Sequence, residues 1–256
     1  MTDDATLWER MSLSMREEFR LMPGETGGSL FESDGVIATI LPAVPDRSLP
    51  NSVLYEDTEG LAKVLEDVAE AYREAGVRAW TVWVPRHDEA TRSLLEGAGH
   101  VLDASPAAMA ADLAAVEPPR DTDLPPADSP RLEELGALND LAYGTGDQLG
   151  KVIGEGEGDP EYVYVAREAG QAVAGLITAD HEGDTSVWWV ATDPEARGRG
   201  LASGLMRHAL ADGRERGNDL STLQATKLGR PVYERLGYRA FGVCDMWERR
   251  APEPAT

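Results

Sequence analysis

The sequence predicts an α/β protein made of two units, in each of which a mixed, mostly antiparallel sheet is flanked by helices. One observation is the segment 118–130, which contains five prolines and no periodic apolar face, so we interpret it as a linker. The other is that the order strand, helix, strand, short helix, strand occurs on both sides of that segment. Together they predict an N-terminal domain at 1–117 and a C-terminal domain at 131–250.

In the N-terminal domain, one amphipathic helix dominates the pattern, and Gly76 ends it. Its buried face is expected to carry Leu61, Val64, Leu65, Val68, Ala69 and Tyr72. The other elements expected here are a strand at 52–55, a strand at 78–84, a short helix at 89–95 and a strand at 100–102.

The C-terminal domain repeats this order after a helix and a hairpin of its own. Aligning LLEGAGH with VYERLGY matches Gly99 to Gly237 and sets Leu95 opposite Tyr233, which favours two copies of one unit. The glycine-rich segment 144–159 is expected to be a mobile surface loop that borders a substrate site. The expected elements are a helix at 131–143, strands at 162–166, 172–178 and 186–190, a helix at 201–216, a strand at 221–225, a short helix at 231–236 and a strand at 238–241.

Composition and charge exclude several classes of protein. No apolar run approaches the roughly 20 residues of a membrane helix, and the N-terminus is acidic where a signal peptide is basic, so a cytoplasmic protein without a membrane partner is expected. The formal net charge of -22 disfavours nucleic acid as a partner. Cys244 is the only cysteine, which excludes an intrachain disulfide and a cysteine-based zinc site, and no metal is expected.

The most informative stretch is VWWVATDPEARGRGLASGLMRHAL, in which a strand runs through a turn directly into a helix. The first N–H groups of a helix lack intrahelical partners and form an anion site with the helix dipole. Gly198 and Gly200 let phosphate oxygens approach the main chain, and Arg197 and Arg199 add positive charge. The lysine and hydroxyl residue of a nucleotide P-loop are absent, and the dinucleotide pattern of three glycines is incomplete.

This turn resembles the Gln/Arg-x-x-Gly-x-Gly/Ala coenzyme A signature of the GNAT superfamily of N-acetyltransferases. The segment VYERLGY resembles the Tyr-x-x-x-Gly-Phe/Tyr motif of the same superfamily. The resemblance implies two GNAT-like units, of which the C-terminal one binds acetyl-coenzyme A as co-substrate and acetylates a primary amine, most simply that of a small molecule. The residues that it implies for coenzyme A are Val190, Thr192, Arg197, Gly198, Arg199, Gly200, Leu201, Ala202 and Thr226.

The resemblance also assigns chemical roles. Tyr233 would be the general acid that protonates the departing thiolate, because a phenol with a pKa near 10 keeps its proton at neutral pH. The main-chain N–H of Val190 would donate to the thioester carbonyl, at a place where the strands 186–190 and 221–225 splay apart. Thr226 stands where many members of the superfamily have asparagine.

The sequence leaves the acceptor and the general base open. Asp180, His181 and Glu182 lie at a predicted turn and are candidates for the base. Trp188 and Trp189 are adjacent, so on a regular strand they face opposite sides, and one of them could line the acceptor pocket.

The N-terminal unit has acidic residues at 56–59 where the other unit has arginines and glycines, and Leu95 where the other has its acid. We therefore expect a degenerate GNAT-like half that covers the active half or shapes its acceptor site. A noncatalytic coenzyme A sensor and a protein acetyltransferase acting on lysine or an N-terminal amine are the alternatives, and a homodimer stays open.

Overall fold

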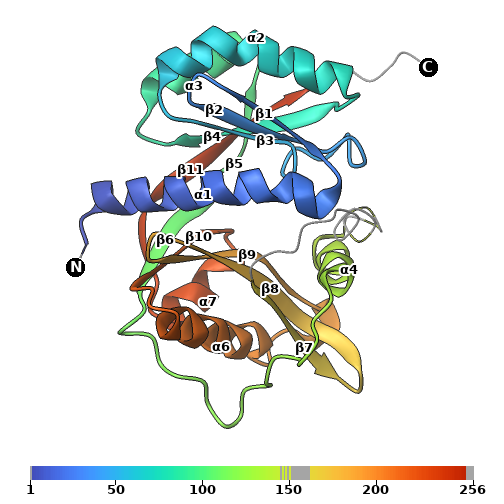
Figure 1. Ribbon diagram of the computed structural model, residues 1–256, viewed down its shortest axis with the longest axis vertical. Coiled ribbons are helices and arrows are strands. Elements are labelled where there is room, and N and C mark those ends of the chain that lie inside the picture. The colour runs from blue at the N-terminus through green and yellow to red at the C-terminus, as the bar shows by residue number, and fades with distance from the viewer. Residues whose placement is uncertain (1, 145, 147, 149, 151–161, 252–256) are drawn as a thin grey trace.

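The fold is known from a computed structural model, which describes residues 2–144, 146, 148, 150 and 162–251 (Figure 1). The predicted loop 144–159 therefore lies almost wholly outside the described residues. The described strands form one sheet in the order β1-β2-β3-β4-β11-β6-β10-β9-β8-β7, and β5 pairs with β11 beside this path. The pairs β3–β4 and β9–β10 are parallel and the others are antiparallel, as the mixed, mostly antiparallel prediction requires.

The predicted elements are present, and five described elements were not predicted: a long first helix, three strands and the short 3-10 helix η1. The N-terminal unit contains α1 (Asp4–Thr26), β1 (Ser29–Ser33), β2 (Val36–Ile40), β3 (Ser52–Tyr55), α2 (Thr58–Glu74), β4 (Ala79–Pro85), α3 (Glu89–Gly97) and β5 (Val101–Ala104). The remaining elements are β6 (Ala107–Asp112), α4 (Leu132–Tyr143), β7 (Tyr162–Glu168), β8 (Gln171–His181), β9 (Asp184–Thr192), η1 (Pro194–Ala196), α6 (Leu201–Glu215), β10 (Leu220–Ala225), α7 (Arg230–Arg235) and β11 (Arg239–Arg250).

The helix α1 lies between the two halves of the sheet (Figure 1). The side chain of Asp3 caps it by accepting hydrogen bonds from the N–H groups of Ala5 and Thr6. Apolar residues four apart place one row of side chains on one face of a helix. This row, in which no member is more than 5% exposed, comprises Leu7, Met11, Met15, Phe19 and Met22.

Two strands cross between the halves. The first part of β11 pairs with β6 and its last part pairs with β4, so that one strand serves both units. The strand β6 precedes the linker in sequence, yet it pairs with β10 of the C-terminal unit. The division of the chain into two domains at 118–130 stays a proposal. Strands from both sides of this segment pair with one another.

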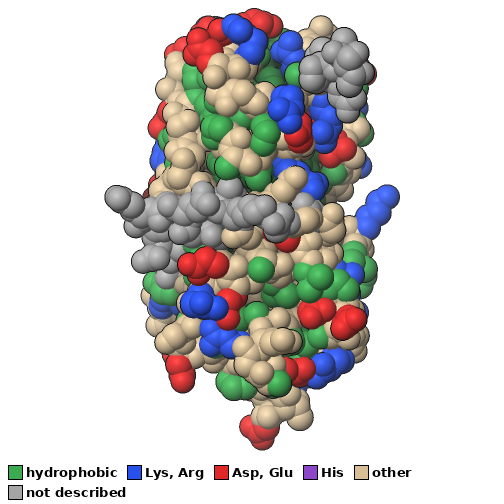
Figure 2. Space-filling model, turned by 90° about the vertical axis from the view of Figure 1, so that its right-hand side faces the viewer, with side chains coloured by type: hydrophobic (Ala, Val, Ile, Leu, Met, Phe, Trp, Pro, Cys, Tyr) green, Lys and Arg blue, Asp and Glu red, His purple; other side chains and the backbone are tan. Residues whose placement is uncertain are grey.

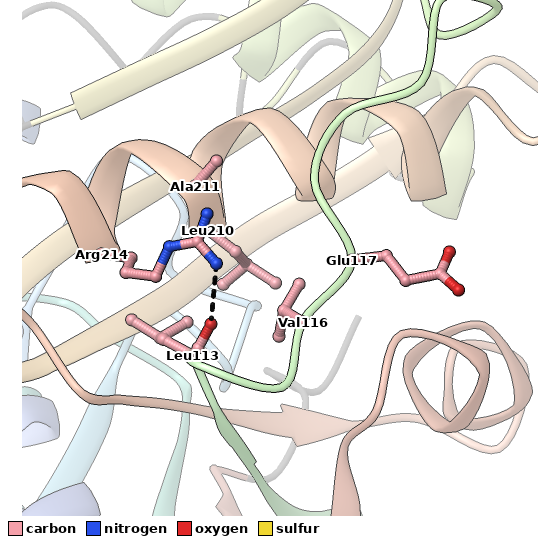
Figure 3. Close-up of a pocket in the computed structure, with 6 residues that line it drawn as sticks. All are labelled: Leu113, Val116, Glu117, Leu210, Ala211 and Arg214. Carbon is pink, nitrogen blue, oxygen red and sulfur yellow. Dashed lines mark hydrogen bonds between the residues drawn. The ribbon is translucent and has the colours of Figure 1, made fainter.

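The segment that follows β6 has no helix or strand, and it lies against the C-terminal unit. Figure 3 shows Leu113 and Val116 beside Leu210 of α6, with Arg214 donating a 3.5 Å hydrogen bond to the carbonyl oxygen of Leu113. Farther along, Asp123 forms a two-bonded ion pair with Arg207, at 2.6 and 2.8 Å, and both side chains are less than 10% exposed. The expected linker is therefore fixed to α6.

On the face shown in Figure 2, acidic side chains are interspersed with lysine and arginine, so the negative charge does not gather in one patch there. Within the part of the chain that the structure describes, no helix is both long and apolar enough to span a membrane.

Candidate functional site

The turn between β9 and α6 leaves its main chain open. Gly198 and Gly200 have φ angles of 78° and 79°, in the left-handed region that favours glycine. A Cβ atom at either position would meet no atom within 4 Å. Among the described residues, none caps the N-terminus of α6 with a side chain, and the first turn carries no acidic residue. The N–H groups there are available to an anion, and the turn has room for one.

The two arginines of the turn contact other parts of the protein. Arg197 donates a 2.8 Å hydrogen bond to the carbonyl oxygen of Ala142, in the last turn of α4. Arg199 forms an ion pair with Glu168 at the end of β7, and both side chains are partly exposed. The expected local positive charge is therefore partly offset by Glu168. An ion pair this exposed contributes little to stability, so a bound anion can compete for Arg199.

The strands β9 and β10 diverge as predicted. They pair only through Asp184 and Leu220, near the start of each strand. The other edge of β10 pairs along its whole length with β6, which keeps β10 in the sheet. Toward their carboxyl ends, at Val190 and Ala225, the described pairing no longer joins the two strands, and we call this unpaired stretch the gap.

A β-bulge lies in β9 beside this gap. The register between β8 and β9 shifts there, so that Trp189 and Val190 stand opposite one residue of β8, Leu176. Trp189 has a φ of 55°, which a residue with a large side chain seldom adopts. The pairing with β8 therefore does not fix the peptide between Trp189 and Val190.

The bulge changes where the two tryptophans point. Trp188 packs against the cluster formed by α1 and the inner strands, and Trp189 packs against Met22 and Leu41 of the N-terminal unit. Val190 packs against the C-terminal core. The expectation that the tryptophans face opposite sides of the sheet is wrong, because the extra residue of the bulge interrupts the alternation.

Asp184 lies in a buried polar cluster where β9 and β10 meet. Its Oδ2 accepts hydrogen bonds from Ser14 of α1, at 2.7 Å, and from Thr222 of β10, at 2.6 Å. Its Oδ1 is buried without a hydrogen-bond partner in the described structure. Burial raises the pKa of Asp184 to about 6, against the lowering effect of the two hydroxyl donors. The cluster joins α1 to the end of the gap at which β9 and β10 still pair.

Tyr233 is 8% exposed and lies on the short helix α7. Its ring packs edge-on against Tyr238, with centroids 5.9 Å apart, and Gly229 gives it room, since a Cβ there would lie 2.9 Å from the ring. Burial raises the pKa of Tyr233 well above its usual value, and the nearby Tyr143 raises it further. The phenol therefore keeps its proton at neutral pH.

The remaining predicted contacts are close to the turn or to α7. Leu201 packs partly against the C-terminal core, and Ala202 follows it in the first turn of α6. Thr192 is the last residue of β9. The hydroxyl of Thr226 accepts a 3.1 Å hydrogen bond from the N–H of Gly229, so it shapes the turn that leads into α7.

The candidate bases lie at the other end of β9. His181 pairs with Asp184 in the hairpin, and Asp180 forms an ion pair with Arg216 at 2.6 Å. Asp184 and Val190 are six residues apart on one strand, which corresponds to about 20 Å. Asp180, His181 and Glu182 are therefore far from Val190, the proposed donor to the thioester.

The corresponding turn of the N-terminal unit is closed. The side chain of Asp57 accepts a 2.8 Å hydrogen bond from the N–H of Gly60, so it caps α2 where an anion would sit. A Cβ at Gly60 would lie 2.4 Å from the carbonyl oxygen of Asp34, which leaves no room for a ligand. Leu95 is fully buried. A groove of about 540 Å³ in this unit lies elsewhere, between the end of α2 and the end of β11.

Comparison with known proteins gives one sequence match and several structural ones. Residues 159–240 match the family model for the acetyltransferase (GNAT) domain. No curated protein matches the sequence. A GCN5-related N-acetyltransferase from Kribbella flavida is similar with a TM-score of 0.67 and 17% identity, over 95% of this chain and 95% of that chain.

Two further solved structures resemble the chain. A GCN5-related N-acetyltransferase from Sphaerobacter thermophilus is similar with a TM-score of 0.58 and 17% identity, over 89% of this chain and 84% of that chain. A tandem GNAT protein from the clavulanic acid biosynthesis pathway is similar with a TM-score of 0.53 and 13% identity, over 90% of this chain and 80% of that chain. The predicted fold class and the resemblance to the GNAT superfamily are confirmed.

Proposed function

We propose that the GNAT acetyltransferase domain of this chain transfers an acetyl group from acetyl-coenzyme A to the primary amine of a small molecule, with Tyr233 as general acid. The observation that carries this proposal is the open turn at Gly198 and Gly200, which leads into an uncapped helix N-terminus. The first N–H groups of α6, together with Arg197 and Arg199, fit a diphosphate. Tyr233 belongs to the apolar core against which Val190 and Leu201 pack, so the proposed acid lies in the same unit as the turn.

The chemistry follows from three groups. A free amine attacks the thioester carbon, so that a C–N bond forms, the C–S bond breaks and the amine loses a proton to a base or to water. The N–H of Val190 would donate to the carbonyl oxygen, where negative charge grows during attack. Tyr233 would give its proton to the departing sulfur and recover it from solvent. Among the described residues, no group of side chains could hold a metal ion, and this proposal uses none.

The N-terminal unit, 1–117 in this proposal, shapes the acceptor side. Trp189 of the bulge packs against Met22 and Leu41, so residues of both units meet next to Val190. Arg47, in the segment between β2 and β3, donates a 2.9 Å hydrogen bond to Gln148. Contacts between the units beside the proposed donor support a small amine over a protein chain as the acceptor. The cytoplasmic location, the homodimer and the lack of nucleic-acid or membrane partners stay predictions from the sequence.

Calorimetric titration with acetyl-coenzyme A tests binding, and we expect one site per chain. Two sites per chain would contradict a degenerate N-terminal unit. Thiol release measured on a panel of small amines, aminoglycosides and peptides then tests transfer. Silence across the panel with coenzyme A bound would favour a noncatalytic sensor, and release with peptides alone would favour a protein acetyltransferase.

A further inference from the structure

The side chain of Asn139 connects α4 to the bulge of β9. Asn139 is 2% exposed, and its Nδ2 donates two hydrogen bonds. One goes to the carbonyl oxygen of Leu135, at 2.9 Å, one turn earlier in the same helix. The other goes to the carbonyl oxygen of Trp189, at 3.1 Å. Both protons of this buried amide are therefore used, and one of them fixes a main-chain group of the bulge.

The carbonyl of Trp189 and the N–H of Val190 belong to one peptide unit. Cis peptide bonds are absent from the described chain, so the two groups point in opposite directions in one plane. A hydrogen bond that fixes the oxygen thus also fixes the direction of the N–H. A hydrogen bond accepted by an amide oxygen also polarises the amide, which strengthens the N–H as a donor.

This peptide unit needs support from outside the strand. The bulge takes it out of register with β8, and the gap separates it from β10. The left-handed φ of Trp189 is less stable than ordinary strand geometry, so an unsupported peptide would relax. The hydroxyl of Tyr143 also contacts the bulge, at 3.2 Å from the carbonyl oxygen of Val190, but that oxygen belongs to the next peptide unit.

We infer that Asn139 is a positioning residue, which holds the N–H of Val190 toward the thioester carbonyl through the oxygen of Trp189. The inference rests on the proposed function, in which Val190 is the donor. It adds that a side chain of α4 controls the direction and strength of this N–H donor, although α4 lies outside both motifs that the sequence analysis identified. The diphosphate turn is not part of this contact. Changing Asn139 should therefore alter the polarisation of the thioester and leave the affinity of the protein for acetyl-coenzyme A nearly unchanged.

The test uses acetyl-coenzyme A labelled with ¹³C at the acetyl carbonyl, whose infrared stretching frequency falls when the oxygen accepts a hydrogen bond. Two variants remove the contact. Asn139→Leu removes both hydrogen bonds of the amide. Asn139→Ser is the more conservative variant, because a serine hydroxyl can still bond the carbonyl oxygen of Leu135 but is too short to reach Trp189. Glu134→Gln is the matched control, since it weakens the ion pair of α4 with Arg167 and leaves the bulge untouched.

The wild-type protein and Glu134→Gln should lower the carbonyl frequency of the bound label, and both Asn139 variants should lose more than half of that shift. Calorimetric affinity for acetyl-coenzyme A should change less than about threefold, and thiol release with an active amine should fall about tenfold or more. An unchanged shift in Asn139→Ser, with the label bound, would overturn the inference and leave the proposed function standing. A wild-type protein that binds without any shift would overturn the role of Val190, and failure to bind would overturn both.

Discussion

Replacing Asp184 by asparagine should flatten the dependence of stability on pH. The pKa of this buried carboxyl is raised from 3.8 to about 6. Because the folded state binds the proton more tightly than the unfolded state does, stability falls as pH rises from the unfolded pKa toward the folded one. As the pH rises from about 4.5 to about 7.5, the pKa shift of Asp184 lowers the free energy of unfolding of the wild-type protein by about 2 kcal/mol. Asp184→Asn has no carboxyl to titrate at this position and should not show this loss.

The assay is urea unfolding of the wild-type protein and Asp184→Asn at both pH values, followed by circular dichroism. The quantity compared is the change of unfolding free energy between the two pH values, because the absolute stability of the variant also contains the cost of a new buried amide. Ser14→Ala serves as the second arm, since loss of its hydroxyl donor raises the pKa of Asp184 further and steepens the wild-type trend. Equal pH dependence in wild type and Asp184→Asn would refute the reasoning.

Three further predictions concern the turn, the acid and the linker. Gly198→Ala should weaken acetyl-coenzyme A binding in calorimetry. Gly99→Ala is the control, because Gly99 is equally left-handed and open but lies outside the site, so this variant should lose similar stability and keep its binding. Equal binding by the two variants would contradict the role of the turn. Tyr233→Phe should lower the rate of thiol release about 100-fold with little change in affinity, and an unchanged rate would exclude the tyrosine as acid. Asp123→Ala should destabilise the protein by about 3 kcal/mol, measured by urea unfolding, because Arg207 is left buried without its partner; an effect as small as that of exposed Glu117→Ala would contradict this.

Local patterns predicted the elements that build the site. The glycines at 198 and 200, the amphipathic helix after them and the proline and glycine that bound α7 act through their own backbone, so they can be recognised without knowing the neighbours. The same holds for α2, whose apolar spacing matches its buried face. These features placed Val190 and Tyr233 on the correct elements.

What the sequence did not predict depends on contacts between distant segments. The strand β6 is mostly alanine, which gives little strand signal, and it forms because β10 and β11 lie on either side of it. The bulge at Trp189 exists only relative to β8, so an isolated strand pattern cannot show it. Asn139 is an ordinary polar residue of a helix until its amide is seen at Trp189. The helix α1 did carry a signal, since one row of its apolar residues recurs three or four positions apart.

The path of β11 has a consequence for how the protein can be made. This strand leaves the ribosome after all other described strands, and both halves of the sheet pair with it. Until then, β4 and β6 each expose an unpaired edge, which is a surface prone to wrong association. The N-terminal half therefore cannot finish folding during its own synthesis, and a gene cut within 118–130 would yield two fragments that each lack a strand supplied by the other.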